Sequence, residues 1–290
     1  MPSPIAKDGL LDMTGAQLRA FLAVAEYGGF GSAARELNVS QPTISKAVKS
    51  LERKLGPLFE RSRGRAATLS PVGEIVRSEA ANVIQLLREI ERRIELRLEG
   101  LPQIRVAVGE YLYNRCKDAV SEYSTENSDI SIRLEMISSR ADAYRALRLG
   151  DIDILLVSSF GSSAEKPRIS AQTTMKVYRS VTHAGEASSR LILPILAPHE
   201  AQEFMEAFRQ IGLSGAENAL TIPNYYSIKS MCIAGHGQAL LFEEDTQADV
   251  AAGRLIQAVP GSITVTRGCH FFGESPTLEK LGRFLVASMG

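Results

Sequence analysis

The sequence predicts an α + α/β protein with a small helical domain, one long helix and a larger domain of alternating strands and helices. Three observations lead to this fold class. Residues 30–49 have the pattern of two short helices around a tight turn. Apolar residues between positions 72 and 94 recur every three or four residues, as they do along one face of a helix. From residue 104 onward, short apolar runs alternate with amphipathic stretches, which is typical of β-α-β units.

The composition is that of a globular protein with more than one domain. The chain has 290 residues, of which 44% are hydrophobic and 23% charged, and a single domain rarely needs that length. No apolar run reaches the roughly 20 residues that cross a bilayer, and the N-terminal segment lacks the pattern of a signal peptide. We therefore expect a cytoplasmic protein without a membrane partner.

Positive charge is concentrated near the N-terminus, although the formal net charge of the chain is zero. Between Arg35 and Ser70, eight Lys and Arg residues face three Glu residues, which leaves this segment at +5. A small basic module attached to a larger, mildly acidic body favours a protein that holds DNA at one end. A protein that packages DNA without sequence preference would instead need a strongly positive chain throughout.

Residues 1–12 are expected to form an extension, and a first helix is predicted over about 15–27. Thr14 is a suitable N-cap for this helix, because its hydroxyl can accept a hydrogen bond from the first turn. The glycines at 28 and 29 end it.

Residues 30–49 predict a helix-turn-helix. Asn38 favours the turn, and Ser40 is the expected N-cap of the second helix, where a proline in the first turn is tolerated. The outer face of the second helix carries polar and cationic side chains of the kinds that contact bases and phosphates. We predict DNA contacts from Ser32, Ser40, Gln41, Pro42, Thr43, Ser45, Lys46 and Lys49. The alternative is a helical hairpin inside a larger all-α domain.

A wing is predicted after the second helix, because Gly56 and Pro57 end that helix and ERSRGRAATLS has the pattern of two short strands joined by a tight turn. We predict that its arginines contact phosphates or the minor groove. These arginines are Arg61, Arg63 and Arg65. The alternative is a solvated basic loop. The DNA-binding domain is expected to span residues 13–70.

Residues 71–100 predict a linker helix that pairs with its own copy. Ser70 and Pro71 suit its N-terminus. Its apolar residues are separated by three or four positions, close to the 3.5-residue period of paired helices. They are Val72, Val76, Ala80, Val83, Leu87, Ile90 and Ile94. A homodimer formed there would place two recognition helices in successive major grooves.

Residues 101–290 predict a domain of two α/β subdomains. Its first half is expected to contain strands over 104–108, 130–138 and 152–159, and helices over about 112–126 and 141–150. This order indicates a parallel sheet with right-handed crossovers. Irregular chain is expected from 160, then a strand near 175–183 and further strands and helices. Because the strand near 262–272 returns to the first half, subdomain I is expected at about 101–160 and 263–290, and subdomain II at about 161–262.

The run from Leu18 to Glu74, LRAFLAVAEYGGFGSAARELNVSQPTISKAVKSLERKLGPLFERSRGRAATLSPVGE, resembles the N-terminal winged helix-turn-helix of LysR-type transcriptional regulators. The second half is more loosely similar to the effector domain of that family, through the segment IAGHGQALLF. The resemblance implies a domain of type-II periplasmic-binding-protein fold, a transcriptional regulator that binds double-stranded operator DNA, and a small-molecule effector between the subdomains. It also implies a homotetramer built from two dimers.

In open α/β sheets, ligands bind beyond the carboxyl ends of the parallel strands. Applied to this sequence, the rule predicts an effector site lined by Glu110, Tyr111, Leu112, Ser138, Ser139, Ser158, Tyr225, Tyr226 and Ser227. Glu110 opposes an anionic effector unless Arg115 or Arg140 offsets its charge. We therefore expect an uncharged, polyol or partly cationic effector. The alternative is a set of ordinary loop residues around an empty cleft.

No sequence pattern indicates catalysis or metal binding. The histidines show no HxH or HExxH spacing, and GxSxG, Walker and CxxC motifs are absent. We expect no enzyme activity, cofactor or metal. Cys116, Cys232 and Cys269 are too widely spaced for a disulfide framework. Two alternatives stay open: a thiol-based redox regulator acting through Cys232, and a solute-binding protein or enzyme with an incidental N-terminal module.

Overall fold

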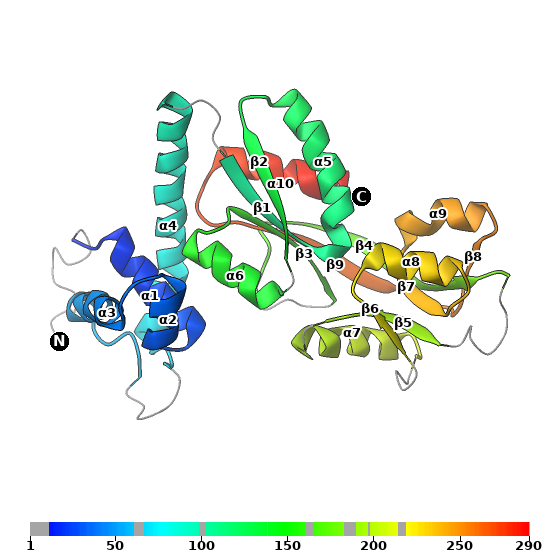
Figure 1. The fold of residues 1–290 in the computed structure, drawn as a ribbon, viewed down its shortest axis with the longest axis horizontal. Helices are drawn as coiled ribbons and strands as arrows, with labels where there is room; N and C mark the ends of the chain where they lie inside the picture. Colours follow the sequence, from blue (N-terminus) through cyan, green and yellow to red (C-terminus); the bar gives the residue numbers. More distant parts are fainter. Residues whose placement is uncertain are drawn as a thin grey trace.

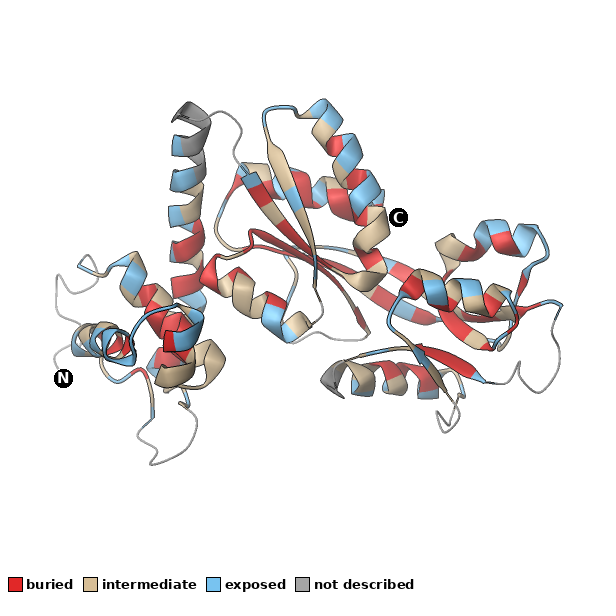
Figure 2. Ribbon diagram, in the orientation of Figure 1, coloured by how far each residue is buried: buried red, intermediate tan, exposed pale blue. Residues whose placement is uncertain are grey.

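A helical domain and an elongated α/β domain make up the chain, with one long helix between them (Figure 1). Buried residues line the inside of both domains (Figure 2). The structure is a computed structural model, and it describes residues 12–60, 67–98, 103–137, 139–160, 165–182, 190–196, 198–213 and 219–289.

Three helices begin the N-terminal domain: α1 (Gly15–Tyr27), α2 (Phe30–Glu36) and α3 (Gln41–Leu55). As predicted, Thr14 caps α1, in a capping box with Gln17, and Ser40 caps α3 by accepting a hydrogen bond from the Thr43 N–H. Asn38 lies between α2 and α3 with φ at 53°, a left-handed conformation that asparagine adopts more readily than most residues. The predicted helix-turn-helix is therefore confirmed.

The base of the predicted wing consists of two short arms, in which Phe59 pairs with Leu69 in antiparallel fashion. The next helix packs very closely on this base. A Cβ atom added at Gly73 would lie 2.1 Å from the carbonyl oxygen of Leu58, so only glycine permits the approach. The expected turn of the wing lies outside the described residues, and with it Arg61, Arg63 and Arg65.

Helix α4 (Pro71–Leu98) has two different faces. One face packs on its own chain, where Ala80, Ala81, Ile84 and Gln85 are buried. The other carries an apolar stripe that this chain leaves exposed: Val72, Ile75, Val83, Leu86, Leu87, Ile90 and Ile94. The predicted seam is therefore wrong at Val76 and Ala80, because the N-terminal core covers both positions.

The first half of the C-terminal domain follows the predicted β-α-β order. Its parallel strands are β1 (Gln103–Gly109), β2 (Ser131–Ile137) and β3 (Ile154–Phe160), with β1 in the middle. The connections are a 3-10 turn, η1 (Glu110–Leu112), and two helices, α5 (Tyr113–Glu126) and α6 (Arg140–Leu149).

The second half repeats this construction on a smaller scale. Its elements are β5 (Leu191–Pro194), α7 (Pro198–Gln210), β6 (Leu220–Ile222), α8 (Tyr225–Ile233), β7 (Gln238–Phe242), α9 (Glu243–Ala251) and β8 (Leu255–Gln257). Strand β5 lies between β6 and β7 and runs parallel to both. The last helix, α10 (Pro276–Ser288), packs against α5 and the core of the first half.

Two long strands join the halves into one sheet of order β2-β1-β3-β9-β4-β7-β5-β6. They are β4 (Ile169–Ser180) and β9 (Ile263–His270), which pair antiparallel along β4 from Ile169 to Met175. The sequence prediction of irregular chain before a strand near 175 is wrong, because β4 begins six residues earlier, at Ile169. This part of β4 is rich in Ser, Gln and Thr and only partly buried, so its extended form depends on pairing with β9.

Candidate nucleic-acid interface and effector cleft

The core of the N-terminal domain fixes which side of α3 faces outward. Ile44, Val48 and Leu51 are buried, as helical spacing requires of residues on one face. The opposite face is therefore held in solvent. Its exposed side chains are Gln41, Pro42, Thr43, Lys46 and Lys49, with Ser45 half-buried beside them.

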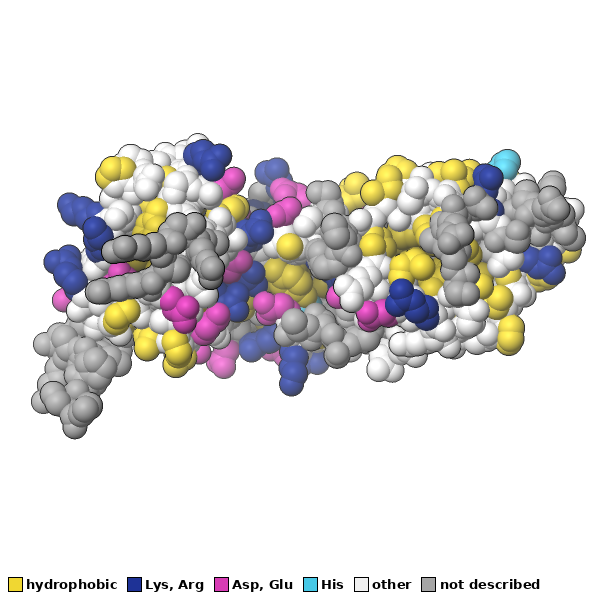
Figure 3. Space-filling model, turned by 90° about the horizontal axis from the view of Figure 1, so that it is seen from below, with side chains coloured by type: hydrophobic (Ala, Val, Ile, Leu, Met, Phe, Trp, Pro, Cys, Tyr) yellow, Lys and Arg dark blue, Asp and Glu magenta, His cyan; other side chains and the backbone are white. Residues whose placement is uncertain are grey.

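The cations of α3 are not engaged by the rest of the protein. Lys46, Lys49 and Arg53 form no ion pair with any residue that the structure describes, and they line an open groove between α3 and the base of the wing. Seen from below, Lys and Arg side chains lie along the edges of the N-terminal domain, at the left of Figure 3. Unpaired cations on an exposed helix suit a polyanion such as DNA.

Two of the predicted DNA-contacting serines also have structural roles. The Ser40 hydroxyl accepts a hydrogen bond from the Thr43 N–H and lies 2.8 Å from the Thr43 hydroxyl. It thereby fixes the first turn of α3, where Gln41 begins the outward face. Ser32 on α2 is half-buried, and its hydroxyl accepts a hydrogen bond from Arg35 at 3.5 Å.

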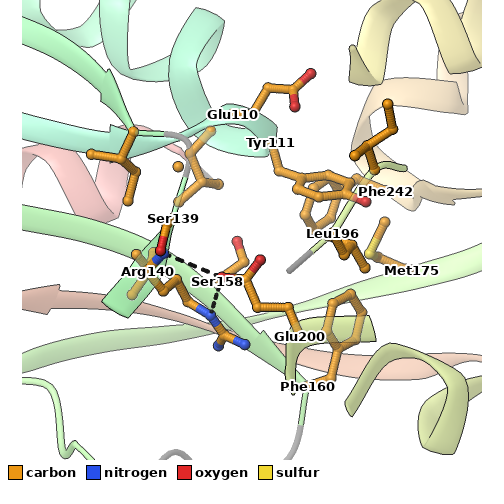
Figure 4. A pocket seen from close by; sticks show the side chains of 15 residues that line it. Glu110, Tyr111, Ser139, Arg140, Ser158, Phe160, Met175, Leu196, Glu200 and Phe242 are labelled. Atoms are coloured by element: carbon orange, nitrogen blue, oxygen red, sulfur yellow. Dashed lines mark hydrogen bonds and ion pairs between the residues drawn. The ribbon is translucent and has the colours of Figure 1, made fainter. Parts of the chain in front are cut away.

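A cavity of about 100 Å³ lies at the carboxyl ends of β1 and β3, between the two halves of the C-terminal domain (Figure 4). Five residues predicted from the sequence line it: Glu110, Tyr111, Leu112, Ser139 and Ser158. The remaining lining consists of Gly109, Ile137, Arg140, Val157, Phe160, Met175, Ile195, Leu196, Glu200 and Phe242. Ser138 lies outside the described residues.

The structure places Tyr225, Tyr226 and Ser227 outside this lining. Helix α8 begins at Tyr225, so these three residues form its first turn. The Tyr225 side chain is 2% exposed; its hydroxyl donates to Asp245 Oδ2 at 3.0 Å and accepts from the Phe242 N–H at 2.9 Å. Its ring centroid lies 5.3 Å from that of Tyr111, so Tyr225 supports a lining residue from behind.

Glu110 is directed at α8. Its Oε1 accepts a hydrogen bond from the Tyr225 N–H at 2.9 Å, and in Figure 4 its carboxylate points away from Arg140 and Ser158. Burial raises the pKa of Glu110, and the hydrogen bond from Tyr225 lowers it in part. The N-terminus of α8, which would otherwise suit an anion, therefore already holds a carboxylate of the chain itself.

Arg140 at the start of α6 is held by two glutamates of α7. Its Nε donates to Glu200 Oε1 at 3.0 Å, and one terminal nitrogen donates to Glu203 Oε2 at 2.6 Å. Arg115 pairs with Asp245. Within the described part of the chain, neither arginine forms an ion pair with Glu110. The negative charge of Glu110 is therefore not offset by an ion pair with Arg115 or Arg140, which the sequence had left open.

Sequence reasoning missed the apolar lining of the cavity. Phe160 and Met175 lie on strands and Leu196 in the chain before α7, and each fits an ordinary core pattern. No local signal marks them, because they face each other only when β3, β4 and β7 join one sheet. The single available hint was their position near strand ends.

The cysteines do not suit redox sensing. Burial raises the pKa of Cys116, Cys232 and Cys269 to about 12, whereas reactive thiols need a lowered pKa and access to solvent. All three are buried, and the Cys232 thiol donates to the Tyr178 carbonyl oxygen at 3.2 Å. These contacts argue against the redox alternative.

The described residues contain neither a candidate metal-binding cluster nor a candidate membrane-spanning helix. They contain no group of three or more His, Cys, Asp and Glu residues placed to hold a metal ion. No helix among them has the length and apolar character needed to cross a membrane.

Comparison with known proteins identifies the N-terminal domain. Residues 16–74 match the family described as "Bacterial regulatory helix-turn-helix protein, lysR family". A probable RuBisCO transcriptional regulator of Synechocystis is 32% identical over 188 residues, which cover 63% of this chain and 50% of the relative. The chain spans about half the length of the curated relatives it matches, or less.

Solved structures match over nearly the whole chain. ArgP from Mycobacterium tuberculosis has a TM-score of 0.60 at 17% identity and covers 94% of this chain and 96% of its own. LysG from Corynebacterium glutamicum with its bound effector Arg has a TM-score of 0.58 at 17% identity and covers 96% and 98%. These likenesses confirm the predicted fold class. The helix-turn-helix domain therefore matches the lysR family, and the chain as a whole shares the fold of these two structures.

Proposed function

We propose that this protein is a sequence-specific DNA-binding transcriptional regulator of the cytoplasm, without catalytic activity, controlled by a small molecule bound between its two α/β subdomains. The observation that carries the proposal is the outward face of α3, whose cations are exposed and unpaired within the described chain. The lysR-family match of the surrounding domain supports it.

Each exposed residue of α3 has a role set by its chemistry. Gln41 can bond an adenine edge, and Thr43 can contact a thymine methyl group. Lys46 and Lys49 can neutralise phosphates or bond guanine. The proposed DNA-contacting set also includes Ser32, Ser40, Pro42 and Ser45, and the predicted wing arginines Arg61, Arg63 and Arg65.

A second copy of the chain is the proposed partner of α4. The exposed apolar stripe defined above runs from Val72 to Ile94, and a single long helix with such a stripe buries it most simply against its own copy. Pairing of α4 would fix the distance between two recognition helices, which DNA half-sites require. A homotetramer of two such dimers is proposed on the family resemblance.

Helix α6 supports control of the DNA-binding domain by the cleft, because it packs on α1 and α4 (Figure 1) and its first residue lines the cavity. At its N-terminus Arg140 lines the cavity. At its C-terminal end Arg148 forms two hydrogen bonds of 2.5 Å with Glu26 of α1, and Arg19 pairs with Asp151 at 2.5 Å. A ligand that displaces α6 would therefore change contacts with the helix-turn-helix domain.

Selection of the full chain against randomised duplexes, followed by binding titrations at several salt concentrations, tests the proposal. Enrichment of a common sequence is expected. Lys49→Ala should weaken all duplexes alike and reduce the salt slope by about one unit, whereas Gln41→Ala should relax base preference by roughly 1–3 kcal/mol. Lys117→Ala, which removes an exposed lysine of α5 far from α3 in the sequence, is the control and should change neither. The proposal fails if no duplex is preferred at low salt.

A further inference from the structure

The charged residues at the cleft already form ion pairs or hydrogen bonds within the protein. Arg140 is bonded to both Glu200 and Glu203, and its side chain and that of Glu200 are only 16% and 13% exposed. Glu110 is bonded to the first turn of α8. An incoming anion would find the guanidinium bonded to both glutamates, and an incoming cation would compete with Arg140 for Glu200.

Two hydroxyl groups of the lining have no hydrogen-bond partner among the described residues. The Tyr111 hydroxyl and the Ser158 hydroxyl are both buried, and neither bonds any residue within the described ranges. Both belong to the cavity lining, and in Figure 4 they lie on either side of its centre, with Tyr111 next to Phe242. Buried hydroxyls normally have a hydrogen-bond partner, so a ligand that reaches either one would complete a hydrogen bond that the described residues leave unmade.

The rest of the cavity favours a ligand that is small and largely apolar. Phe160, Met175, Leu196 and Phe242 form the side opposite Arg140 (Figure 4). The cavity volume of about 100 Å³ is of the same order as the roughly 150 Å³ of an apolar protein cavity that accepts benzene. A single six-membered ring or a short branched chain is therefore the appropriate size.

We propose that the cleft binds a small uncharged molecule with an aromatic or branched aliphatic body and an oxygen that hydrogen-bonds to the hydroxyl of Tyr111 or of Ser158. This inference rests on the proposed function, because it names the chemical class of the effector. Burial of an unpaired charge among the apolar side chains would be costly, and the two neutral hydroxyls are buried side-chain groups of the described lining that lack a hydrogen-bond partner.

Matched ligands that differ in charge test the class. Isothermal titration of the full chain with benzyl alcohol, benzoate and benzylamine compares a neutral, an anionic and a cationic ligand that share one aromatic ring. Isoamyl alcohol, isovalerate and isoamylamine make the same comparison for a branched aliphatic chain. At least one alcohol should bind about 10-fold more tightly than its two charged counterparts. The inference is overturned if neither alcohol binds, or if a charged member binds as tightly as its alcohol.

Two variants test the hydrogen bonds. Tyr111→Phe or Ser158→Ala, whichever removes the hydroxyl that the ligand contacts, should weaken binding of the alcohol by roughly 3- to 10-fold, the effect of one neutral hydrogen bond. Tyr226→Phe is the control, because it removes the same hydroxyl from a residue outside the lining. Unchanged affinity in both cavity variants, or an equal loss in Tyr226→Phe, would contradict the assignment.

The same protein preparation separates the two proposals. If the chain selects a DNA sequence but binds the charged ligands, the inference about the effector class falls and the regulator remains. If it binds the alcohols but ignores every duplex, the proposed function falls while the assignment of the cleft stands.

Discussion

The outer face of α3 and the cleft between the subdomains both carry charged side chains, and they hold them in opposite ways. Lys46 and Lys49 are exposed and have no ion-pair partner among the described residues. At the cleft, Arg140 bonds Glu200 and Glu203, and Glu110 bonds the start of α8. A surface that attracts a polyanion keeps its charge hydrated and available, whereas an enclosed site must compensate its charges within the fold.

The compensated arrangement continues beneath the cleft. Arg267 on β9 is completely buried; it bonds Glu244 and the Met289 carbonyl oxygen, and its guanidinium lies 4.8 Å from the ring centroid of Phe242. Phe242 lines the cavity. Charge at these positions of the C-terminal domain therefore supports its structure, while the cations at Lys46 and Lys49 of α3 stay exposed.

The sharpest test of this contrast is one substitution made in both regions. Arg267→Met should lower the free energy of unfolding by about 3–5 kcal/mol, because it leaves Glu244 without its buried partner. Lys49→Met should change it by no more than about 0.5 kcal/mol, since the side chain is exposed. Urea unfolding of the two variants measures both. Similar losses in the two variants would remove the distinction.

Acidification should destabilise the C-terminal domain through His270. Burial lowers the pKa of this imidazole from 6.5 to about 4, and the neutral ring bonds the Tyr144 hydroxyl at 2.9 Å. As the pH falls, His270 of the unfolded chain binds a proton before His270 of the folded chain does. The contribution of neutral His270 to the free energy of unfolding is therefore present above pH 6.5 and is lost as the pH falls through about 4.

The expected loss from His270 is roughly 3 kcal/mol at most. Unfolding free energies of the parent and of His270→Gln, measured between pH 7 and pH 4, provide the test. The variant should lack this part of the pH dependence. Identical slopes in the two proteins would show that His270 is not the group responsible.

The contact between the two regions should also be measurable. Arg148 and Glu26 are 11% and 6% exposed and share two hydrogen bonds of 2.5 Å. A double-mutant cycle with Arg148→Ala and Glu26→Ala should give a coupling free energy of about 1–3 kcal/mol in urea unfolding. Arg145→Ala with Glu26→Ala is a suitable control, because Arg145 bonds Asp142. Additive effects in the Arg148 cycle would show that α6 and α1 are not coupled here.

The smallest expected effect concerns Glu110. Its raised pKa means that burial disfavours the ionised form in the folded state, so the carboxyl contributes more stability below its pKa than above it. Glu110→Gln keeps an oxygen for the Tyr225 N–H and removes the charge. At pH 7 the variant should be as stable as the parent or up to about 0.5 kcal/mol more stable, and the difference should shrink on acidification. A large loss of stability at pH 7 would mean that the charge itself holds α8.

Local patterns were sufficient for the helix-turn-helix and for the parallel strands. The caps at Thr14 and Ser40 and the turn at Asn38 involve residues close in sequence, so their chemistry is visible in the sequence. The start of β4 at Ile169 was not predicted, because pairing with β9 decides it and the segment itself is polar. The seam on α4 was wrong at Ala80 for a related reason: the core of the N-terminal domain covers that position.

The sequence by itself determined the order of the elements and the outward chemistry of α3, since both follow from residue types at short spacing. Only the tertiary structure decided the character of the cleft. Phe160, Met175 and Phe242 meet there from three strands, and Arg140 finds its carboxylates on α7, 60 and 63 residues away in the chain. A ligand site enclosed between two subdomains depends on which side chains meet and which charges are already paired, and these are properties of contacts distant in sequence.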